Sequence, residues 1–512
     1  MLSFMGHTYT YKGIFEQAQA LARYFSKVLK LKPGDRVAIV MPNTPQFVIS
    51  FLAAQLCGLI TVGINPLYTQ REIKQILDHA EAKCVLISNA KAQLMHDLVE
   101  TLKIRPHVIT SDLTDSLPRL KAWGINFYLR WFKGQKKHCY ESFMSFRKII
   151  KKHKGHQPIC VKRKSHDIAL LQYTSGTTGL PKGVMLTHNN ILSNIHQIND
   201  VFSAIGIQDG DKQLLVLPFF HIYGLSVFLN GLKHRFQGVL IANPQDTDAL
   251  INTLAQEKPN ILPIINTLMV SLLQNPRFQK MDFSWLHATI TGGMATQLAV
   301  ANRWRQITGC VVNQGYGLSE TSPIIAITRC KKHEHFLNHV GQVLKETKVK
   351  LLNRKGRVVK QGEPGELYVK GPQVMSGYWR SIKETAAVMK NGWFKTGDIA
   401  RIDNDGNIEI VDRIKDMIVI SGFNVFPSEV EYVLNQHEKV IESAVIGAKS
   451  NFGNEIIKAF IVVESPLTKK SIKQFCKTHL ASYKVPGEIV FVDEIPKSHI
   501  GKILKRNLKA AV

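Results

Sequence analysis

The sequence has few cysteines, and they are scattered along the chain. Seven occur among 512 residues, at positions 57, 84, 139, 160, 310, 330 and 476. The number is odd and no Cys-x-x-Cys pair occurs, which argues against a disulfide framework and a structural zinc site. We therefore expect a reducing compartment, the cytoplasm.

We also expect no signal peptide, because no basic region followed by a long apolar one opens the chain. One long stretch, 37–70, carries no charge, but Pro42, Asn43, Pro45 and Gln46 interrupt it. A buried strand–helix–strand unit explains this stretch better than a bilayer span does.

Acidic residues are scarce. There are 39 Asp and Glu against 66 Lys and Arg, a formal net charge of +27. Nucleic acid, an anionic membrane, and polyanionic substrates such as nucleotides and CoA are the partners that such an excess fits, and a basic solvated surface also explains it. The sequence contains no nucleic-acid recognition motif, so we expect no nucleic-acid partner.

The length and the patterning predict an α/β protein of at least two domains. Strand-like and helix-like runs alternate, which predicts βαβ units and a largely parallel sheet. The strand-like runs are 36–41, 59–64, 84–88, 213–218, 238–242, 261–265 and 288–292, and the early helical runs are 45–56 and 71–79. After Asp412 the chain becomes denser in charge, with a helical run at 469–479, so we place an N-terminal domain at 1–412 and a smaller α+β domain at 413–512.

The range 113–164 is rich in Lys, Arg and aromatic residues. Leu120, Trp123, Phe127 and Trp131 recur at helical spacing, with basic residues at 119, 121, 130 and 133. One interpretation is an amphipathic helix on an anionic membrane, where each basic residue adds ~1 kcal/mol. The alternative is a helix that packs on its own domain with its charges in water.

A glycine-rich loop, Tyr173–Gly183, lies between the apolar runs 168–172 and 184–186. Its glycines let the backbone come close to a ligand, and its hydroxyls and Lys182 suit phosphate oxygens. The spacing is not that of a Walker A loop. Alone, the stretch describes an ordinary surface loop as well as a phosphate site.

Three later stretches add further chemistry. Glu320 in 314–323 is a hard oxygen ligand of the kind that Mg²⁺ prefers. Asp398, at the end of 391–398, can accept hydrogen bonds from two ribose hydroxyls. Lys502 follows a glycine in a basic tail. Each is weak by itself, since single Glu and Lys residues are mostly solvated surface groups.

Taken together in this order, the motifs resemble the adenylate-forming superfamily of acyl-CoA synthetases, luciferases and nonribosomal peptide adenylation domains. The resemblance covers nearly the whole chain and is greatest to bacterial long-chain fatty acid–CoA ligases. It is carried by 65–69, 171–179, 369–379, 421–429 and 483–486.

The resemblance implies a large N-terminal domain and a small mobile C-terminal domain around one active site. It implies that a fatty carboxylate attacks the α-phosphate of ATP, with Mg²⁺, and that CoA then displaces AMP. A medium-chain or aryl acid–CoA ligase, an acyl-AMP ligase that loads a carrier protein, and an inactive acyl or nucleotide binder stay open. A homodimer and peripheral attachment to the inner face of the cell membrane also stay open.

The resemblance also assigns roles residue by residue. For the nucleotide these are a triphosphate loop, an adenine pocket with a phosphate contact, and a ribose contact with the hinge: Tyr173, Thr174, Ser175, Gly176, Thr177, Thr178, Gly179 and Lys182; Gly293, Gln314, Gly315, Tyr316 and Ser319; Asp398, Arg413 and Lys415. Thr174 and Glu320 would hold Mg²⁺, and Lys502 would bridge the carboxylate and the α-phosphate. Gly422 and His221 are candidates for the CoA arm and the acyl pocket, although His221 fits a hydrogen-bonded core histidine as well.

The chain departs from the family pattern at three places. Ile414 stands where long-chain ligases usually have lysine, and Ser319 where threonine is usual. The chain also starts within the first conserved strand and helix, so the resemblance implies about one further helix and strand upstream.

Overall fold

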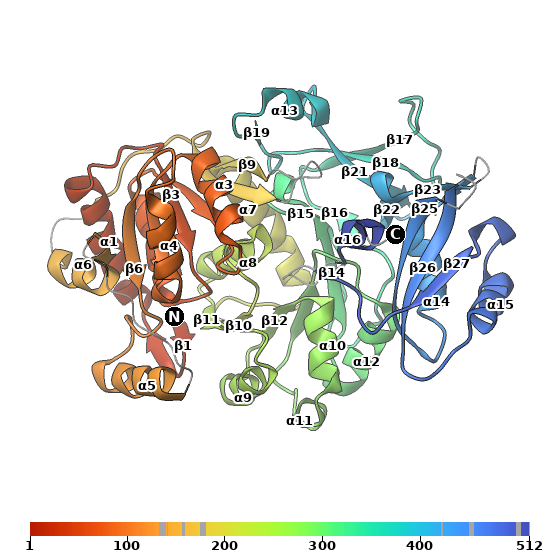
Figure 1. Cartoon of the computed structure of the whole chain (residues 1–512), viewed down its shortest axis with the longest axis horizontal. Helices are drawn as coiled ribbons and strands as arrows, with labels where there is room; N and C mark the ends of the chain where they lie inside the picture. The colour runs from red at the N-terminus through yellow and green to blue at the C-terminus, as the bar shows by residue number, and fades with distance from the viewer. Residues whose placement is uncertain are drawn as a thin grey trace.

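The computed structural model describes residues 1–132, 140, 142–155, 159–174, 181–420, 423–449, 455–497 and 503–510, without the side chains at 119, 128–130, 132, 423, 424, 506 and 510. It is a mixed α/β structure with a large N-terminal domain and a small C-terminal domain, as the sequence predicts (Figure 1). Three sheets build the large domain, and the C-terminal strands form sheets of their own.

The first sheet has eight strands in the order β19-β9-β8-β4-β3-β5-β6-β7. Its strands are β3 (Arg36–Val40), β4 (Ile60–Gly63), β5 (Ala82–Ser88), β6 (His107–Ser111), β7 (Met144–Ser145), β8 (Ile168–Thr174), β9 (Lys182–Thr187) and β19 (Gly377–Tyr378). Neighbouring strands are parallel from β7 through β6, β5, β3 and β4 to β8. Strand β9 pairs antiparallel with both β8 and β19. The predicted βαβ units are therefore confirmed.

The second sheet has nine strands in the order β16-β15-β14-β13-β12-β10-β11-β1-β2. They are β1 (Leu2–Phe4), β2 (His7–Tyr9), β10 (Lys212–Leu215), β11 (Gln237–Leu240), β12 (Ile261–Ile264), β13 (Ala288–Thr291), β14 (Val312–Gly317), β15 (Ile324–Ile327) and β16 (Gln342–Val343). Its middle strands are parallel, and β15 turns back on β14. The third sheet consists of β17 (Lys348–Leu352), β18 (Gly365–Lys370), β20 (Met389–Lys390), β21 (Trp393–Ile402) and β22 (Ile408–Arg413).

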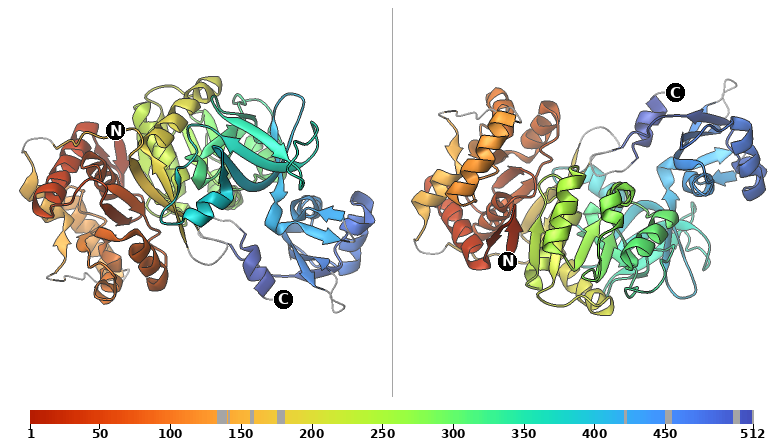
Figure 2. Two further views of the ribbon diagram at one scale, coloured as in Figure 1. Left: turned by 90° about the horizontal axis from the view of Figure 1, so that it is seen from above. Right: turned by 90° about the horizontal axis from the view of Figure 1, so that it is seen from below.

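Helices cover the first and second sheets (Figure 2). In the large domain they are α1 (Tyr11–Arg23), α2 (Pro45–Leu56), α3 (Gln70–Ala80), α4 (Ala92–Val99), α5 (Arg119–Phe132), α6 (Phe146–His153), α7 (His188–Ala204), α8 (Ile222–Lys233), α9 (Thr247–Glu257), α10 (Asn266–Gln274), α11 (Pro276–Gln279), α12 (Leu298–Thr308) and α13 (Ile382–Val388). Short turns of other helix types lie at η1 (Tyr24–Val28), η2 (Asn89–Lys91), η3 (Ser319–Thr321), η4 (Ile414–Asp416) and η5 (Ser482–Lys484).

The uncharged stretch 37–70 folds as the predicted strand–helix–strand unit. Thr44 caps α2 through its side chain, and Pro45 begins the helix, where its missing N–H costs nothing. Val37 and Ile39 pack into the core that also holds α1 and α2, whereas Ala38 and Val40 pack toward α3 and α4. This alternation explains why the strand is apolar on both faces. Within the described residues, no helix combines the length and the apolar character needed to cross a membrane.

The C-terminal domain is a small α+β unit. Its strands are β23 (Ile418–Ile420), β24 (Phe423–Val425), β25 (Val440–Lys449), β26 (Glu455–Val463) and β27 (Glu488–Phe491), and its helices are α14 (Pro427–Leu434), α15 (Lys469–His479) and α16 (Lys505–Ala510). Helices α14 and α15 pack on one face of the β25-β26-β27 sheet, and Leu508 of α16 joins the apolar cluster on the other.

Two buried amides join the first sheet to the second. Asn43 donates from Nδ2 to the carbonyls of Leu215 and Leu217 at 2.9 and 2.8 Å, and its Oδ1 accepts from the amide of Phe219 at 2.9 Å. Gln172, on the strand before the glycine-rich loop, donates to the carbonyl of Phe220 at 2.9 Å. The loop before α8 is thereby held against the first sheet by hydrogen bonds from side-chain amides to its backbone, which no apolar side chain can replace.

We expect Asn43→Ala to lower the free energy of unfolding by about 2–4 kcal/mol, because it removes three buried hydrogen bonds to backbone groups. The measurement is the midpoint of denaturant-induced unfolding. Asn189→Ala, at an exposed position, is the control and should leave the midpoint unchanged. Equal midpoints for the two variants would contradict this account.

Candidate active site

The glycine-rich loop connects the antiparallel strands β8 and β9, as the sequence predicts. The register pairs Thr174 with Lys182 and Tyr173 with Gly183, so these four residues form the base of a hairpin. The loop residues predicted to contact phosphate, Ser175, Gly176, Thr177, Thr178 and Gly179, lie outside the described residues. The described structure therefore fixes the base of the loop and not its tip.

The base of the hairpin is tightly packed. The Tyr173 hydroxyl and His79 Nδ1 are 2.8 Å apart. Burial, followed by the charge of Arg380, lowers the pKa of His79, which favours the neutral ring. A Cβ at Gly183 would lie 3.2 Å from the Tyr173 ring and 3.3 Å from Trp379 Cβ, so only glycine fits there without displacement. Contacts with His79 and Trp379 thus hold the residues at the two ends of the loop in place.

Lys182 has partners in this structure. Its Nζ lies 3.7 Å from Glu384 Oε1 and 5.2 Å from the centre of the Tyr378 ring. The ion pair is half exposed on the glutamate side, so it is weak. A phosphate group would therefore compete with Glu384 for this ammonium at little cost.

Glu320 lies in η3, and its Oε1 accepts a hydrogen bond from the Tyr378 hydroxyl at 2.8 Å. Burial of the carboxyl raises the pKa of Glu320, and the hydrogen bond from Tyr378 only partly offsets this. A half-buried carboxylate fits a divalent ion as its neighbour. The described residues contain no cluster of three or more His, Cys, Asp or Glu that could hold a metal ion by itself.

Asp398 is the most enclosed of the expected site carboxylates. It lies on β21 with 3% of its surface exposed. Its Oδ2 accepts from the Tyr316 hydroxyl at 2.6 Å, and Arg413 Nε lies 3.1 Å from Oδ1. Burial, and then the Asp398 charge, raise the pKa of Tyr316, so that hydroxyl stays protonated and donates. The structure brings these three predicted residues together from β14, β21 and β22.

The remaining residues expected around the adenine lie on or beside β14. Gln314 is buried, and its Oε1 accepts from the amide of Thr296 at 2.7 Å, so its side chain holds the neighbouring loop. Gly315 follows it on the strand, and Ser319 begins η3. Gly293 has φ +82°, a backbone conformation that favours glycine, and open space where a Cβ would be.

The other predicted site residues lie at the start of α8, in η4, or outside the described residues. His221 caps α8, with Nδ1 accepting from the amide of Tyr223 at 3.3 Å. Lys415 lies in η4, two residues beyond Arg413, and burial lowers its pKa, with Arg413 as the next cause. Gly422 and Lys502 lie outside the described residues.

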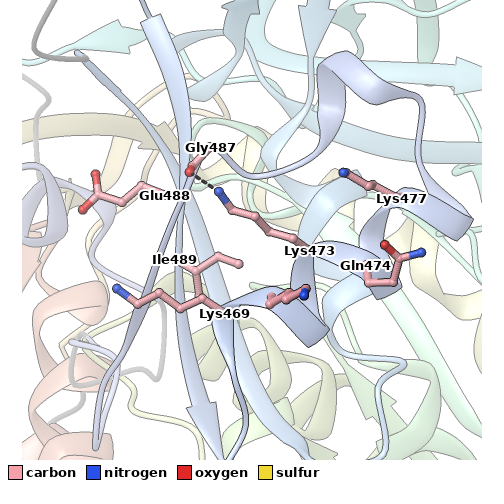
Figure 3. Close-up of a pocket in the computed structure, with 8 residues that line it drawn as sticks. Lys469, Lys473, Gln474, Lys477, Gly487, Glu488 and Ile489 are labelled. Atoms are coloured by element: carbon pink, nitrogen blue, oxygen red, sulfur yellow. Dashed lines mark hydrogen bonds between the residues drawn. The ribbon is translucent and has the colours of Figure 1, made fainter.

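A surface hollow of about 500 Å³ lies elsewhere, in the C-terminal domain. Figure 3 shows it between α15 and the start of β27, where Lys473 donates to the carbonyl of Gly487 at 2.6 Å. It contains none of the predicted site residues. We place the candidate active site at the loops around Asp398 and Glu320 instead, because the enclosed carboxylates and the packed glycines are there.

Family models match the chain over most of its length. Residues 1–379 match the model described as AMP-binding enzyme, and residues 429–502 match the model described as AMP-binding enzyme C-terminal domain. The chain belongs to the AMP-binding enzyme family. The matched ranges include every residue of the candidate site except Asp398, Arg413, Lys415 and Gly422.

Individual members of the family give the same result. A long-chain-fatty-acid–CoA ligase of Escherichia coli O6:H1 is 39% identical over 99% of this chain and 90% of its own length. A 4-coumarate–CoA ligase of Nicotiana tabacum is 30% identical over 98% of this chain and 89% of its own length. The crystal structure of the anthranilate CoA ligase AuaEII with anthranoyl-AMP superposes with a TM-score of 0.88 over 100% of this chain and 93% of its own, at 24% identity, which shows the fold.

The sequence did not single out Tyr378 or Tyr223 in this AMP-binding enzyme. Tyr378 joins Glu320 and Lys182, and Tyr223 donates to the carbonyl of Ile290 at 3.1 Å beside Gly292. Tyr378 lies within the motif 369–379 and Tyr223 follows His221, so position in a motif was the available signal. Their partners lie 58 and 67 residues away and could not be read from the sequence.

We expect Glu320→Gln to raise the thermal unfolding midpoint at pH 7–8. Because folding raises the pKa of the Glu320 carboxyl, this group makes the folded protein less stable as pH rises from the ordinary pKa of glutamate through the raised one. A neutral amide does not titrate and has no such effect. The gain should shrink to nothing as pH falls to the ordinary pKa of glutamate. Glu438→Gln, at an exposed position, is the control. A gain in midpoint that does not change with pH would contradict a raised pKa for Glu320.

Proposed function

We propose that this AMP-binding enzyme joins long-chain fatty acids to CoA in an ATP-dependent reaction that passes through an acyl-adenylate and releases AMP and pyrophosphate. The observation that carries the proposal is the 39% identity, over nearly the whole chain, to a long-chain-fatty-acid–CoA ligase. The chain keeps the residue types that the two half-reactions need, including Lys182, Glu320, Asp398 and Lys502.

The reaction requires no nucleophilic side chain. The fatty carboxylate attacks the α-phosphorus and expels pyrophosphate, and the CoA thiolate then attacks the acyl carbon and expels AMP. The protein contributes positioning and the stabilisation of negative charge. In this proposal Asp398 accepts hydrogen bonds from the ribose hydroxyls, Gln314 to Tyr316 line the adenine pocket, and the glycine-rich loop with Lys182 holds the β- and γ-phosphates.

Mg²⁺ belongs to the proposal. The enclosed carboxylate of Glu320 and the hydroxyl of Thr174, at the end of β8, are the groups that would hold it. When bound, the ion would neutralise phosphate charge. Tyr378 keeps the Glu320 carboxylate oriented through its 2.8 Å hydrogen bond.

The proposal assigns Lys502 to the adenylation half-reaction, in which its ammonium lies between two anions. The described lysines that flank it in the sequence both make ion pairs. Lys497 Nζ lies 2.7 Å from Glu442 Oε2, and Lys505 Nζ lies 2.8 Å from Glu431 Oε1. Both glutamates belong to the C-terminal domain, so Lys497 and Lys505 would move with that domain.

Domain rotation is the second part of this proposal. We place the boundary between residues 412 and 413 and the hinge at Lys415, in η4 between β22 and β23. Rotation about this point would withdraw Lys502 after adenylation and bring Gly422 toward the pantetheine arm of CoA.

Three other functions use the same site. A medium-chain or aryl acid–CoA ligase is the nearest, and the 30% identity to a 4-coumarate–CoA ligase is its support. An acyl-AMP ligase would pass the acyl group to a carrier protein, and an inactive binder would have no use for Lys502. We favour the long-chain ligase because the identity to that class is higher over the same length.

His221 stays a candidate for the border of the acyl pocket. Its Nδ1 already serves the start of α8, so its role there would be to shape the loop rather than to act on the acid. A homodimer, a cytoplasmic location and peripheral attachment to an anionic membrane stay predictions of the sequence.

We expect Lys502→Ala to lower fatty acid-dependent ATP–pyrophosphate exchange by roughly 10²–10³-fold, about 3–4 kcal/mol, because it removes a cation that stabilises charge only during adenylation. Conversion of supplied acyl-AMP and CoA to acyl-CoA should largely survive. Lys470→Ala, at an exposed position of α15, is the control and should leave both half-reactions unchanged. An equal loss in both half-reactions would refute the domain-rotation proposal.

The substrate class is tested with a panel of carboxylic acids from short to long chain together with coumarate. Pyrophosphate release is measured with and without CoA. We expect kcat/KM to be highest for long-chain acids. We also expect continued pyrophosphate release to require CoA. Preference for coumarate would favour the aryl acid ligase, and acyl-AMP that accumulates with CoA present would favour the carrier-loading enzyme.

A further inference from the structure

Helix α5 (Arg119–Phe132) carries a row of large apolar side chains on its outer side. Leu120, Trp123 and Trp131 are 88%, 71% and 76% exposed, and Phe127 between the two tryptophans is also exposed. Positions 120, 123, 127 and 131 repeat at the spacing of one helix face. Burial in the domain's own core therefore does not account for these side chains, because they face away from it.

The three aromatic rings form a continuous ridge. The Trp123 and Phe127 rings stack with centroids 5.9 Å apart, and the Phe127 and Trp131 rings stack at 5.7 Å. With Leu120 they expose on the order of 500 Å² of apolar surface, at the upper end of what a monomeric protein usually shows. The other exposed large apolar residues of the described chain, such as Ile382 and Val358, are not arranged in such a row.

The opposite side of α5 fastens the helix to the domain. Ala122 is buried, Ile125 packs against the main core, and Thr114 donates to Asn126 Oδ1 at 2.9 Å. The helix therefore has a fixed orientation, with the ridge turned outward. It lies at the lower edge of the domain in Figure 1 and on the side that faces the viewer from below in Figure 2.

The helix and the sequence that follows it are basic. Lys121 is exposed, and its Nζ would lie 3.1 Å from a Cβ at Gly6, so the turn between β1 and β2 is a neighbour of the helix. The sequence from 117 to 166 contains one acidic residue, Glu141, among Lys and Arg at 119, 121, 130, 133, 136, 137, 147, 148, 151, 152, 154, 162, 163 and 164. An apolar ridge within a basic region complements a surface that is apolar inside and anionic at its boundary.

We propose that α5 is the surface by which this protein docks on an anionic lipid bilayer, with Leu120, Trp123, Phe127 and Trp131 inserted at the level of the headgroups and acyl chains. Tryptophan is suited to this depth because its ring is apolar and its N–H is polar. The basic residues meet the anionic headgroups. The docking rests on α5 itself, and its value to the enzyme, access to a lipid-borne acid, rests on the proposed function.

A second copy of the chain fits this surface less well. A two-fold interface would place the same patch of each copy against the other. Lys121 and the other basic residues of α5 in both copies would then come close to each other, and like charges across an interface oppose association. Charge complementarity therefore selects the anionic bilayer.

The test is binding of the full chain to vesicles made of equal parts phosphatidylcholine and phosphatidylglycerol, followed by co-sedimentation. We expect Trp123→Gln/Trp131→Gln to bind at least ~10-fold more weakly than the unmodified chain. The matched control, Ile382→Gln/Val358→Gln, removes two equally exposed apolar residues elsewhere and should bind as the unmodified chain does. Lys121→Glu should weaken binding, and pure phosphatidylcholine should bind less than the anionic vesicles.

Tryptophan fluorescence reports insertion directly. The emission of the unmodified chain should shift to shorter wavelength on the anionic vesicles, and that of Trp123→Gln/Trp131→Gln should not, although four of the six tryptophans remain. Binding of this double variant at unmodified strength would overturn the proposal, as would absence of binding by the unmodified chain. A fall in mass from dimer to monomer on mutation, without lipid, would overturn it in favour of a second copy.

The vesicle assay is independent of the ligase reaction. Turnover of a water-soluble medium-chain acid without lipid should be unchanged in the Trp123→Gln/Trp131→Gln variant, because α5 contributes no group to the candidate site. Vesicle binding with no ligase activity would leave the docking surface standing and remove the proposed function. Ligase activity with no vesicle binding would leave the proposed function standing and overturn the docking surface.

Discussion

The buried carboxylate of Asp398 is the constraint on which the candidate site depends. A carboxylate with 3% exposure is tolerated only when its oxygens are paired, and here Tyr316 and Arg413 pair both. These residues belong to β14 of the second sheet and to β21 and β22 of the third. The same contacts therefore join two sheets, shape the candidate site, and fix the chain immediately before it enters the C-terminal domain.

Much of the fold could be predicted from the sequence because local patterns agree with the tertiary structure. The predicted helix at 45–56 is α2 and that at 469–479 is α15, with identical bounds. Alternation of apolar runs was sufficient for the parallel strands, because each is buried on both faces. The order of strands within a sheet was beyond prediction. It places β1 beside β11, more than two hundred residues away in sequence, and no local pattern encodes such a pairing.

The candidate site was predicted through motifs, and the motifs state which residues meet but not what holds them. The hydrogen bonds of Tyr378 to Glu320 and of Asn43 to the loop before α8 depend on side-chain orientation across distant segments. The outer face of α5 is a different case. Its spacing was visible in the sequence, but an inward or outward orientation depends on which side the domain occupies, and the structure decides this through Ala122 and Asn126.

The ion pairs of Lys497 and Lys505 have a consequence for the rate at which the two half-reactions alternate. Lys497 and Lys505, which flank Lys502 in the sequence, pair with glutamates of the C-terminal domain, so in the proposed reaction the supply of Lys502 to the site would be an effective concentration set by the connection between the domains. That connection is short, since only Ile414–Asp416 and Met417 separate β22 from β23. In the proposed rotation, the stiffness and length of this connection would govern how often the Lys502 ammonium reaches the site.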